Sequence, residues 1–253
     1  TGLNGMFSYC KKVTTLNLNS FVNAGLGNFL GFCTNCESLE YISAQNFIWG
    51  NCNAMQGAFT NCKSLKILDL TNFDGTTIKS TDALRLSGFD GVTCPIYYNS
   101  NVCTQYDTPL TSKSNAIDVK GRLMAIYDFN NTVTTSDSAY PVLTGSTVTK
   151  TVDTQGSESH ITHRVIGVDV MPTAISFQPV TGLLNVDYLA VTSSCTSLEK
   201  LFYMCNKLTN INTFGWDVSN TSTFNYSFSN TVSQKLDLTS WSFRKSGVSF
   251  GHM

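Results

Sequence analysis

A repeat of 26 residues is the feature of this sequence that most restricts its fold. Three segments align without gaps: FSYCKKVTTLNLNSF from Phe7, CTNCESLEYISAQNF from Cys33 and FTNCKSLKILDLTNF from Phe59. Their matching cysteines are Cys10, Cys36 and Cys62. Because one short copy cannot bury its own apolar face, the sequence predicts that neighbouring copies stack and share a continuous core.

Two periodicities follow each other within a copy. Before the cysteine, as in AMQGAF (residues 54–59), apolar residues lie three to four positions apart, which is typical of a short helix. After it, Leu68 and Leu70 alternate with Asp69 and Thr71, which is typical of a half-buried strand. The pattern therefore predicts an α/β repeat fold, a leucine-rich-repeat solenoid of about 26-residue helix–strand units.

The repeat returns near the end of the chain, in FYMCNKLTNINTFGW from Phe202 and in KLDLTSW, which ends at Trp241. The segment between the two arrays is rich in Thr, Val and Ser with period-two stretches, which predicts a β-rich or irregular insert. We therefore expect three regions. They are an array with a terminal cap at residues 1–92, the insert at 93–165, and a second array at 166–253 that continues beyond the last residue.

The repeat resembles the BspA-like leucine-rich repeat and the related DUF285-type repeat of bacteria. The resemblance is carried by MFSYCKKVTTLNLNSF, AFTNCKSLKILDLTNF and KLDLTSWSF. It covers residues 5–89 closely and 184–243 more loosely, and it does not cover the middle of the chain. It implies a non-enzymatic surface protein that adheres to host matrix or to other cells. Fibres of viruses that infect bacteria are another place where such repeats are expected.

Low charge excludes some classes of partner. Charged residues make up 13% of the 253 residues and the formal net charge is −1, so no broad positive field favours nucleic acid. Ser, Thr and Asn together supply about a third of the chain, a bias beyond ordinary composition. No apolar stretch approaches the roughly 20 residues that cross a bilayer. These features favour an extracellular or cell-surface location, with a virion as the alternative.

The cysteines and histidines predict no cofactor and no metal site. Cys33 and Cys36 form a C-x-x-C pair, but a zinc site needs a second matching pair, and the repeat already explains Cys36 as one of a column of buried thiols. Cys94 and Cys103 remain a candidate disulfide in an exported protein. His160 and His163 lie near Glu158, and we interpret this segment as a solvated loop.

Binding is a better hypothesis than catalysis, because the sequence contains no nucleophile elbow, phosphate-binding loop or H-E-x-x-H motif. We predict no catalytic residues. The outward strand positions of the repeat predict a ligand-binding surface, with solubilising positions as the equal alternative; these residues are Asn17, Ser43, Asp69, Asn19, Gln45 and Thr71. The predicted function is recognition or adhesion through a protein or glycan ligand on a cell surface. A structural component of a phage virion, which would be a symmetric oligomer, is the alternative, and a fragment of a carbohydrate-active enzyme is a weaker one.

Overall fold

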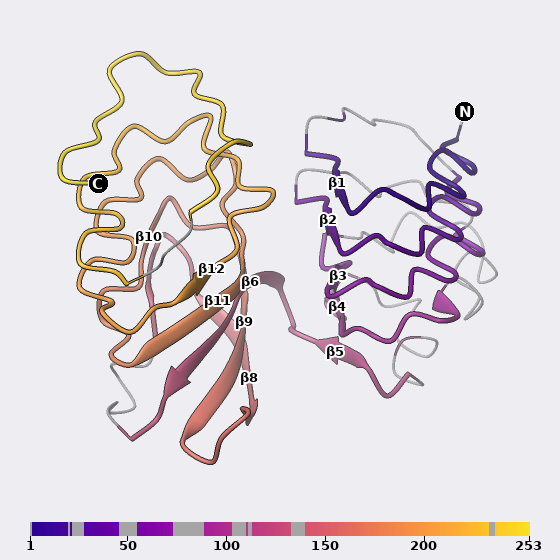
Figure 1. Ribbon diagram of the computed structural model, residues 1–253, viewed down its shortest axis with the longest axis horizontal. Coiled ribbons are helices and arrows are strands. Elements are labelled where there is room, and N and C mark those ends of the chain that lie inside the picture. Colours follow the sequence, from indigo (N-terminus) through magenta and orange to yellow (C-terminus); the bar gives the residue numbers. More distant parts are fainter. Residues whose placement is uncertain are drawn as a thin grey trace. The chain divides into compact units, whose positions relative to one another are not determined.

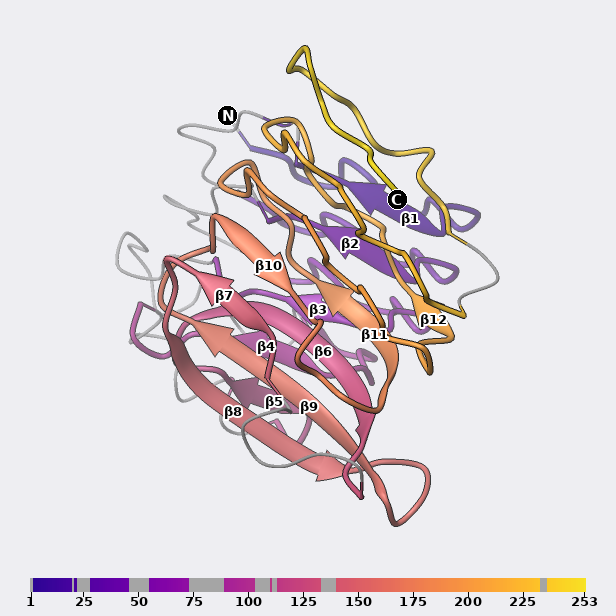
Figure 2. The same cartoon turned by 90° about the vertical axis from the view of Figure 1, so that its left-hand side faces the viewer.

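The computed structural model divides the chain into two compact units, Thr1–Gly121 and Arg122–Met253 (Figures 1 and 2). The residues it describes are 2–19, 21, 28–45, 55–72, 89–102, 110, 113–132, 140–232 and 236–253. The region predicted as an insert, 93–165, contributes strands to both units. Within the described residues, no helix has the length and apolar character to span a membrane.

Short parallel strands organise the first unit. They are β1 (Thr15–Asn17), β2 (Tyr41–Ser43), β3 (Leu68–Asp69), β4 (Ile96–Tyr98) and β5 (Ala116–Asp118). β1 pairs with β2, and β3, β4 and β5 form a second sheet. Thr15 lies opposite Tyr41, so the 26-residue spacing of the sequence is also the register of the strand pair. Leu68 in β3 and Leu70 just after it are buried, as their period-two spacing predicts, but Thr71, predicted to face outward, is buried as well.

Turns take the place of the predicted helices. Residues 4–9, 30–35 and 56–61 are turns, and two residues in each have a left-handed backbone. In the second turn these are Gly31 and Asn35, with φ of +60° and +59°. An α-helix cannot contain such residues, because every position needs φ near −60°. The three-to-four-residue apolar spacing matched a helix, but it arises here from tight turns.

The backbone of these turns forms hydrogen bonds between copies, an arrangement that we call the turn ladder. Alternate N–H groups donate to the next copy, as from Gly31 to Gln56 (2.9 Å) and from Cys33 to Ala58 (2.7 Å). The intervening N–H groups close bonds within the turn, as from Thr34 to Gly31. The turns thus satisfy their backbone groups without helical bonds.

The predicted leucine-rich-repeat solenoid is therefore wrong as a fold class. Among the described residues, the repeats contain no helix–strand units, and the strands of the first unit are short and lie in two sheets, between which the parallel bridge Tyr41–Ile67 is the link. The predicted strand in KLDLTSW is also absent from residues 236–241. The terminal cap predicted at the end of the first array falls mostly outside the described residues, which resume at Phe89.

The repeated cysteines have a structural role. Cys36 and Cys62 are buried, as predicted, and Cys10 is partly buried. The Cys36 thiol donates to the Phe7 carbonyl (2.9 Å) and the Cys62 thiol to the Cys33 carbonyl (3.1 Å), so each bonds to the preceding copy. The seven cysteines that the structure describes are free thiols. Cys103, the proposed partner of Cys94, lies outside the described residues.

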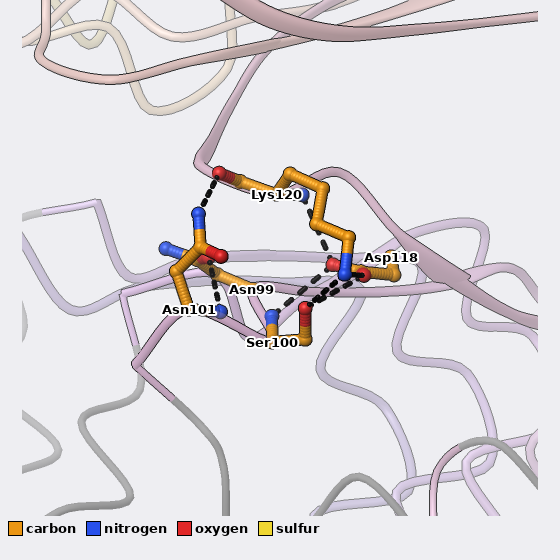
Figure 3. Close-up of polar contacts among 5 residues, drawn as sticks. All are labelled: Asn99, Ser100, Asn101, Asp118 and Lys120. Carbon is orange, nitrogen blue, oxygen red and sulfur yellow. Dashed lines mark hydrogen bonds and ion pairs between the residues drawn. The ribbon is translucent and has the colours of Figure 1, made fainter.

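A closed polar cluster ties the ends of β4 and β5 together (Figure 3). Asp118 Oδ1 accepts from the backbone N–H groups of Ser100 (3.1 Å) and Lys120 (3.0 Å). Asp118 Oδ2 accepts from Ser100 Oγ (2.8 Å) and lies 2.8 Å from Lys120 Nζ. Burial alone would raise the pKa of Asp118, but the bonds from Lys120 and Ser100 outweigh it and lower the pKa to about 2.

We expect this cluster to make the first unit sensitive to acid. A carboxyl with a lowered pKa stabilises the fold above its unfolded-state pKa, and this contribution disappears as the pH falls through the folded-state value. Wild type should therefore lose on the order of 1 kcal/mol relative to Asp118→Asn between about pH 4 and pH 2, after allowance for solvent screening. Urea unfolding across this pH range measures the difference. Asp90→Asn, which changes an exposed carboxylate of the same unit, is the control. Its free energy of unfolding relative to wild type should stay constant over this pH range.

The second unit combines a largely antiparallel sheet, with one parallel pair at its edge, with further repeats. The sheet runs in the order β12 (Asn210–Ile211), β11 (Leu183–Leu189), β6 (Arg122–Asn130), β9 (Ile161–Val168) and β8 (Val148–Gln155). A separate pair joins β7 (Val142–Thr144) to β10 (Ala174–Ser176). Figure 2 shows the five strands with the yellow and orange repeat loops beside them.

The repeats of the second unit use the same turns as those of the first. Residues 199–204 and 225–230 are turns, and their left-handed positions are Lys200, Met204, Tyr226 and Asn230. The turn ladder also continues, with Phe202 N–H donating to the Ser227 carbonyl (2.7 Å). An aromatic row crosses the core of this unit from Tyr127 through Phe177 and Phe202 to Phe228. One turn geometry therefore serves both arrays.

Candidate functional site

The six predicted ligand-binding residues lie at the ends of β1, β2 and β3. Asn17 is exposed, whereas Ser43, Gln45 and Thr71 are 5%, 5% and 2% exposed. Asn19 Nδ2 donates to Ser43 Oγ (2.9 Å), which joins two copies.

The same strand ends close local turns. Asn17 Oδ1 accepts from the Asn19 N–H and Asp69 Oδ1 from the Thr71 N–H, and both are Asx turns. The structure thus gives these polar groups partners within the fold, and their binding role stays a prediction.

A different set of polar residues converges on the five-stranded sheet of the second unit. Asp128 on β6, His163 on β9 and Asp187 on β11 each offer one oxygen or nitrogen, and these three atoms lie within 4.8 Å of one another. His163 Nδ1 donates to Asp128 Oδ1 (2.8 Å). All three side chains are partly buried. We call these residues the Asp–His–Asp cluster.

Strand pairing explains why residues so distant in sequence meet. Asn185, Asp128 and His163 are direct partners across β11, β6 and β9, so they form one row across the sheet. Asp187 lies at an irregularity in the pairing of β11 with β6, between Val186 and Tyr188, where an extra residue redirects the side chains, and its carboxylate comes within 4.8 Å of the other two groups. Val186, between Asn185 and Asp187, is completely buried. Buried side chains on the core side of the sheet therefore hold β6, β9 and β11 in place. The cluster lies on the other side of these strands.

Outer hydrogen bonds orient the Asp128 carboxylate. Asn185 Nδ2 donates to Asp128 Oδ2 (3.1 Å), the oxygen that His163 does not use. The Thr209 hydroxyl lies within bonding distance of Asn185 Oδ1 (3.3 Å) and of the Leu184 carbonyl (3.2 Å). A chain of hydrogen bonds therefore leads from the start of the repeats to the cluster.

The three groups have different electrostatic surroundings. Burial raises the pKa of Asp187, and the nearby Asp128 charge raises it further. Burial also opposes ionisation of Asp128, but bonds from His163 and Asn185 outweigh this effect and lower its pKa. The bond to Asp128 raises the pKa of His163 despite burial. The Asp128–His163 bond thus favours the charged form of both groups, whereas burial and the Asp128 charge disfavour the charged form of Asp187.

Sequence reasoning missed this cluster. His163 was assigned to a solvated loop, but it lies on β9 and is partly buried. Aspartate is depleted in strands, so Asp128 between the apolar neighbours Tyr127 and Phe129 was a usable signal. Nothing in the linear sequence indicated that these residues and Asp187 would become neighbours, because the strand order depends on pairing.

A second candidate site lies along the turns of the repeats in the second unit. It comprises residues on the outer edge of two successive turns and the start of a third, and we call it the turn-edge patch: Lys200, Tyr203, Met204, Tyr226, Asn230 and His252. The Tyr226 ring stacks on His252 (4.9 Å, 13°) and meets Tyr203 edge-on (5.7 Å). Met204 is 54% exposed. Aromatic and amide groups of successive copies thus form one continuous patch.

An open pocket adjoins the turn-edge patch. It has a volume of about 340 Å³ and is lined by β7, β10, Gln178, Pro179, Glu199 and Lys200. Lys200 belongs to both the pocket and the patch. The two features together offer a concave surface beside two partly buried tyrosine rings and the exposed His252, and concave sites with aromatic lining are usual in ligand binding.

Comparison of the chain with family models, curated proteins and solved structures gives no match. The resemblance to BspA-like repeats therefore rests on the repeated residues alone, and the functional argument rests on the geometry of the two candidate sites.

Proposed function

We propose that this protein is a non-enzymatic recognition protein that acts outside the cell and binds a protein or glycan ligand through the turn-edge patch and its adjoining pocket. One observation carries the proposal. Left-handed turn positions that are Gly5, Gly31 and Gly57 in the first unit are Lys200, Tyr226 and His252 in the second. The turn is the same, but the side chains differ in kind.

Large side chains at these positions oppose local stability. A residue with a Cβ costs roughly 1–2 kcal/mol more in the left-handed region than in the right-handed one, and glycine avoids that cost. Three such residues on one edge therefore point to a role other than folding, since strained positions cluster at functional sites. The residue types also suit recognition, because tyrosine presents a large rigid surface with a polar end.

The rigidity of the repeats supports the same proposal. Hydroxyl and amide groups bond one copy to the next, as Ser249 Oγ does to Asn225 Oδ1 (2.7 Å) and Ser222 Oγ to the Thr196 carbonyl (3.0 Å). A patch held in this way loses little conformational freedom on binding. Low net charge provides little electrostatic steering, so shape and hydrogen bonding would determine the ligand.

The test is a binding screen of the full chain on a printed glycan array and on a panel of extracellular-matrix proteins. For a ligand so found, we expect Tyr226→Gly to weaken binding at least about tenfold, since interface tyrosines often contribute more than 1.4 kcal/mol. Glycine preserves the left-handed turn. Tyr9→Gly is the control, because Tyr9 is also a tyrosine with a left-handed backbone but lies in the first unit. Equal loss in both variants, or in neither, would contradict the proposal.

A further inference from the structure

We propose that the Asp–His–Asp cluster is a binding site for a divalent transition-metal ion, with Zn²⁺ as the representative ion. Asp128, His163 and Asp187 supply one nitrogen and two carboxylates from three adjacent strands. This site is separate from the turn-edge patch, and it stands whether or not that patch binds a ligand.

The donor set indicates the kind of ion. Zn²⁺ accepts both imidazole nitrogen and carboxylate oxygen at about 2.0–2.2 Å. Ca²⁺ and Mg²⁺ prefer oxygen donors alone, so His163 disfavours them. The three donor atoms lie within 4.8 Å of one another, and His163 Nδ1 and Asp128 Oδ1, 2.8 Å apart, share a proton that Zn²⁺ would displace because a ligating histidine is neutral. Three protein ligands leave at least one coordination position for water or another group.

The surroundings of Asp128 match those of a built metal site. Metal-ligating carboxylates are usually held by outer hydrogen bonds that fix their orientation. Asn185 provides such a bond to Asp128 Oδ2 and leaves Oδ1 directed at His163. Thr209 in turn contacts Asn185. An incidental ion pair on a sheet does not require this second layer.

Asp187 provides an independent argument. Within the described part of the chain, its carboxylate accepts no hydrogen bond, although its backbone carbonyl accepts one from Asn212 Nδ2 (3.1 Å). The carboxylate is partly buried and close to the charge of Asp128. A partly buried carboxylate beside a second one is unfavourable unless a positive charge offsets it. A dication held between the three side chains would offset both carboxylates.

The competing explanation is a structural Asp128–His163 ion pair with Asp187 as an unrelated neighbour. This explanation and the metal site differ in what they require of Asp187. The ion pair does not need Asp187, and neutralising Asp187 would remove the repulsion between its charge and that of Asp128. The metal site needs Asp187 as its third ligand. Asp187→Asn therefore distinguishes the two explanations, because it retains size and removes charge.

The experiment is calorimetric titration of the chelator-treated full chain with Zn²⁺. We expect one saturable site, with Asp187→Asn and His163→Gln each weakening it about 100-fold and Asn185→Leu about 10-fold, the range seen for second-layer changes. His160→Gln is the matched control, because His160 also pairs with a carboxylate, Glu158 (3.1 Å), but is not part of the cluster. Its affinity should equal that of wild type.

Two further measurements exclude trivial outcomes. Zn²⁺ should raise the melting temperature of wild type by mass action and leave that of Asp187→Asn unchanged. Metal-free Asp187→Asn should melt at or above the wild-type temperature, which shows that its lost affinity is not lost folding. Co²⁺ in the site should give a spectrum without thiolate charge-transfer bands, which excludes the cysteines. Wild-type affinity in Asp187→Asn, thiolate bands, or no saturable binding would overturn the proposal.

Discussion

Replacing Phe202 by alanine should destabilise the second unit by about 3–5 kcal/mol, the range for large aromatic residues in cores. Phe202 is completely buried and lies between Phe177 (ring centroids 5.4 Å apart) and Phe228 (5.8 Å). Its removal leaves a cavity in the middle of the aromatic row, and the turn ladder on both sides prevents the backbone from closing it. Urea unfolding followed by tryptophan fluorescence measures the effect, since Trp216 and Trp241 stack in the same core cluster (5.7 Å).

Lys207→Ala is the control, because Lys207 is exposed on the same repeat. Its effect should lie within about 0.5 kcal/mol, as for most surface substitutions. A Phe202→Ala cost below about 1.5 kcal/mol would mean that the aromatic row is loosely packed, and the description of a shared core in this unit would then fail.

Replacing Gly31 by alanine should destabilise the first unit by about 1–2 kcal/mol, because Gly31 has φ of +60°. An added Cβ would also lie 3.2 Å from Thr34 Oγ1, which is already bonded to the Gly57 carbonyl (2.5 Å). If residues 30–35 formed a helix, the same change would stabilise the protein by about 1 kcal/mol. The sign of the effect in urea unfolding followed by circular dichroism therefore separates the turn from the helix.

Gly31→Asn is the matched control for added side-chain bulk. Asn35 and Asn61 already occupy left-handed positions of these turns, with φ near +60°, and asparagine tolerates this region better than alanine. We expect Asn to be less destabilising than Ala at residue 31. The reverse order, or a stabilising alanine, would contradict the turn structure.

The 26-residue step between repeats could be predicted from the sequence, but the backbone conformation within each repeat could not. The aligned repeats correctly predicted that Cys36 and Cys62 are buried. The alternating spacing of Leu68 and Leu70 likewise predicted that both side chains are buried. The prediction failed at Gly31 and Gly57, where three-to-four-residue apolar spacing suggested a helix. In the first array, Gly5, Gly31 and Gly57 with Asn35 and Asn61 were the counter-signal, because glycine and asparagine favour left-handed turns.

The candidate sites were harder to foresee for a different reason. Asp128, His163 and Asp187 become neighbours only through the strand order β11–β6–β9, which no local pattern specifies. The turn-edge patch was hidden by the helix assignment, since Tyr226 and His252 share an edge only when residues 225–230 form a turn.

The constant spacing of the turn ladder restricts how the gene for this protein can change length. Each rung joins a residue to the equivalent turn of the next copy, with Thr15 opposite Tyr41 setting a step of 26 residues. Tandem duplication of 26 codons adds a copy whose turns find the same partners on both sides. In the first unit, an insertion of any other length within a turn displaces the left-handed positions from glycines and asparagines such as Gly31 and Asn35. Recombination between copies should therefore vary the length of this protein in whole repeats, and the exposed turn residues can diversify with each added copy.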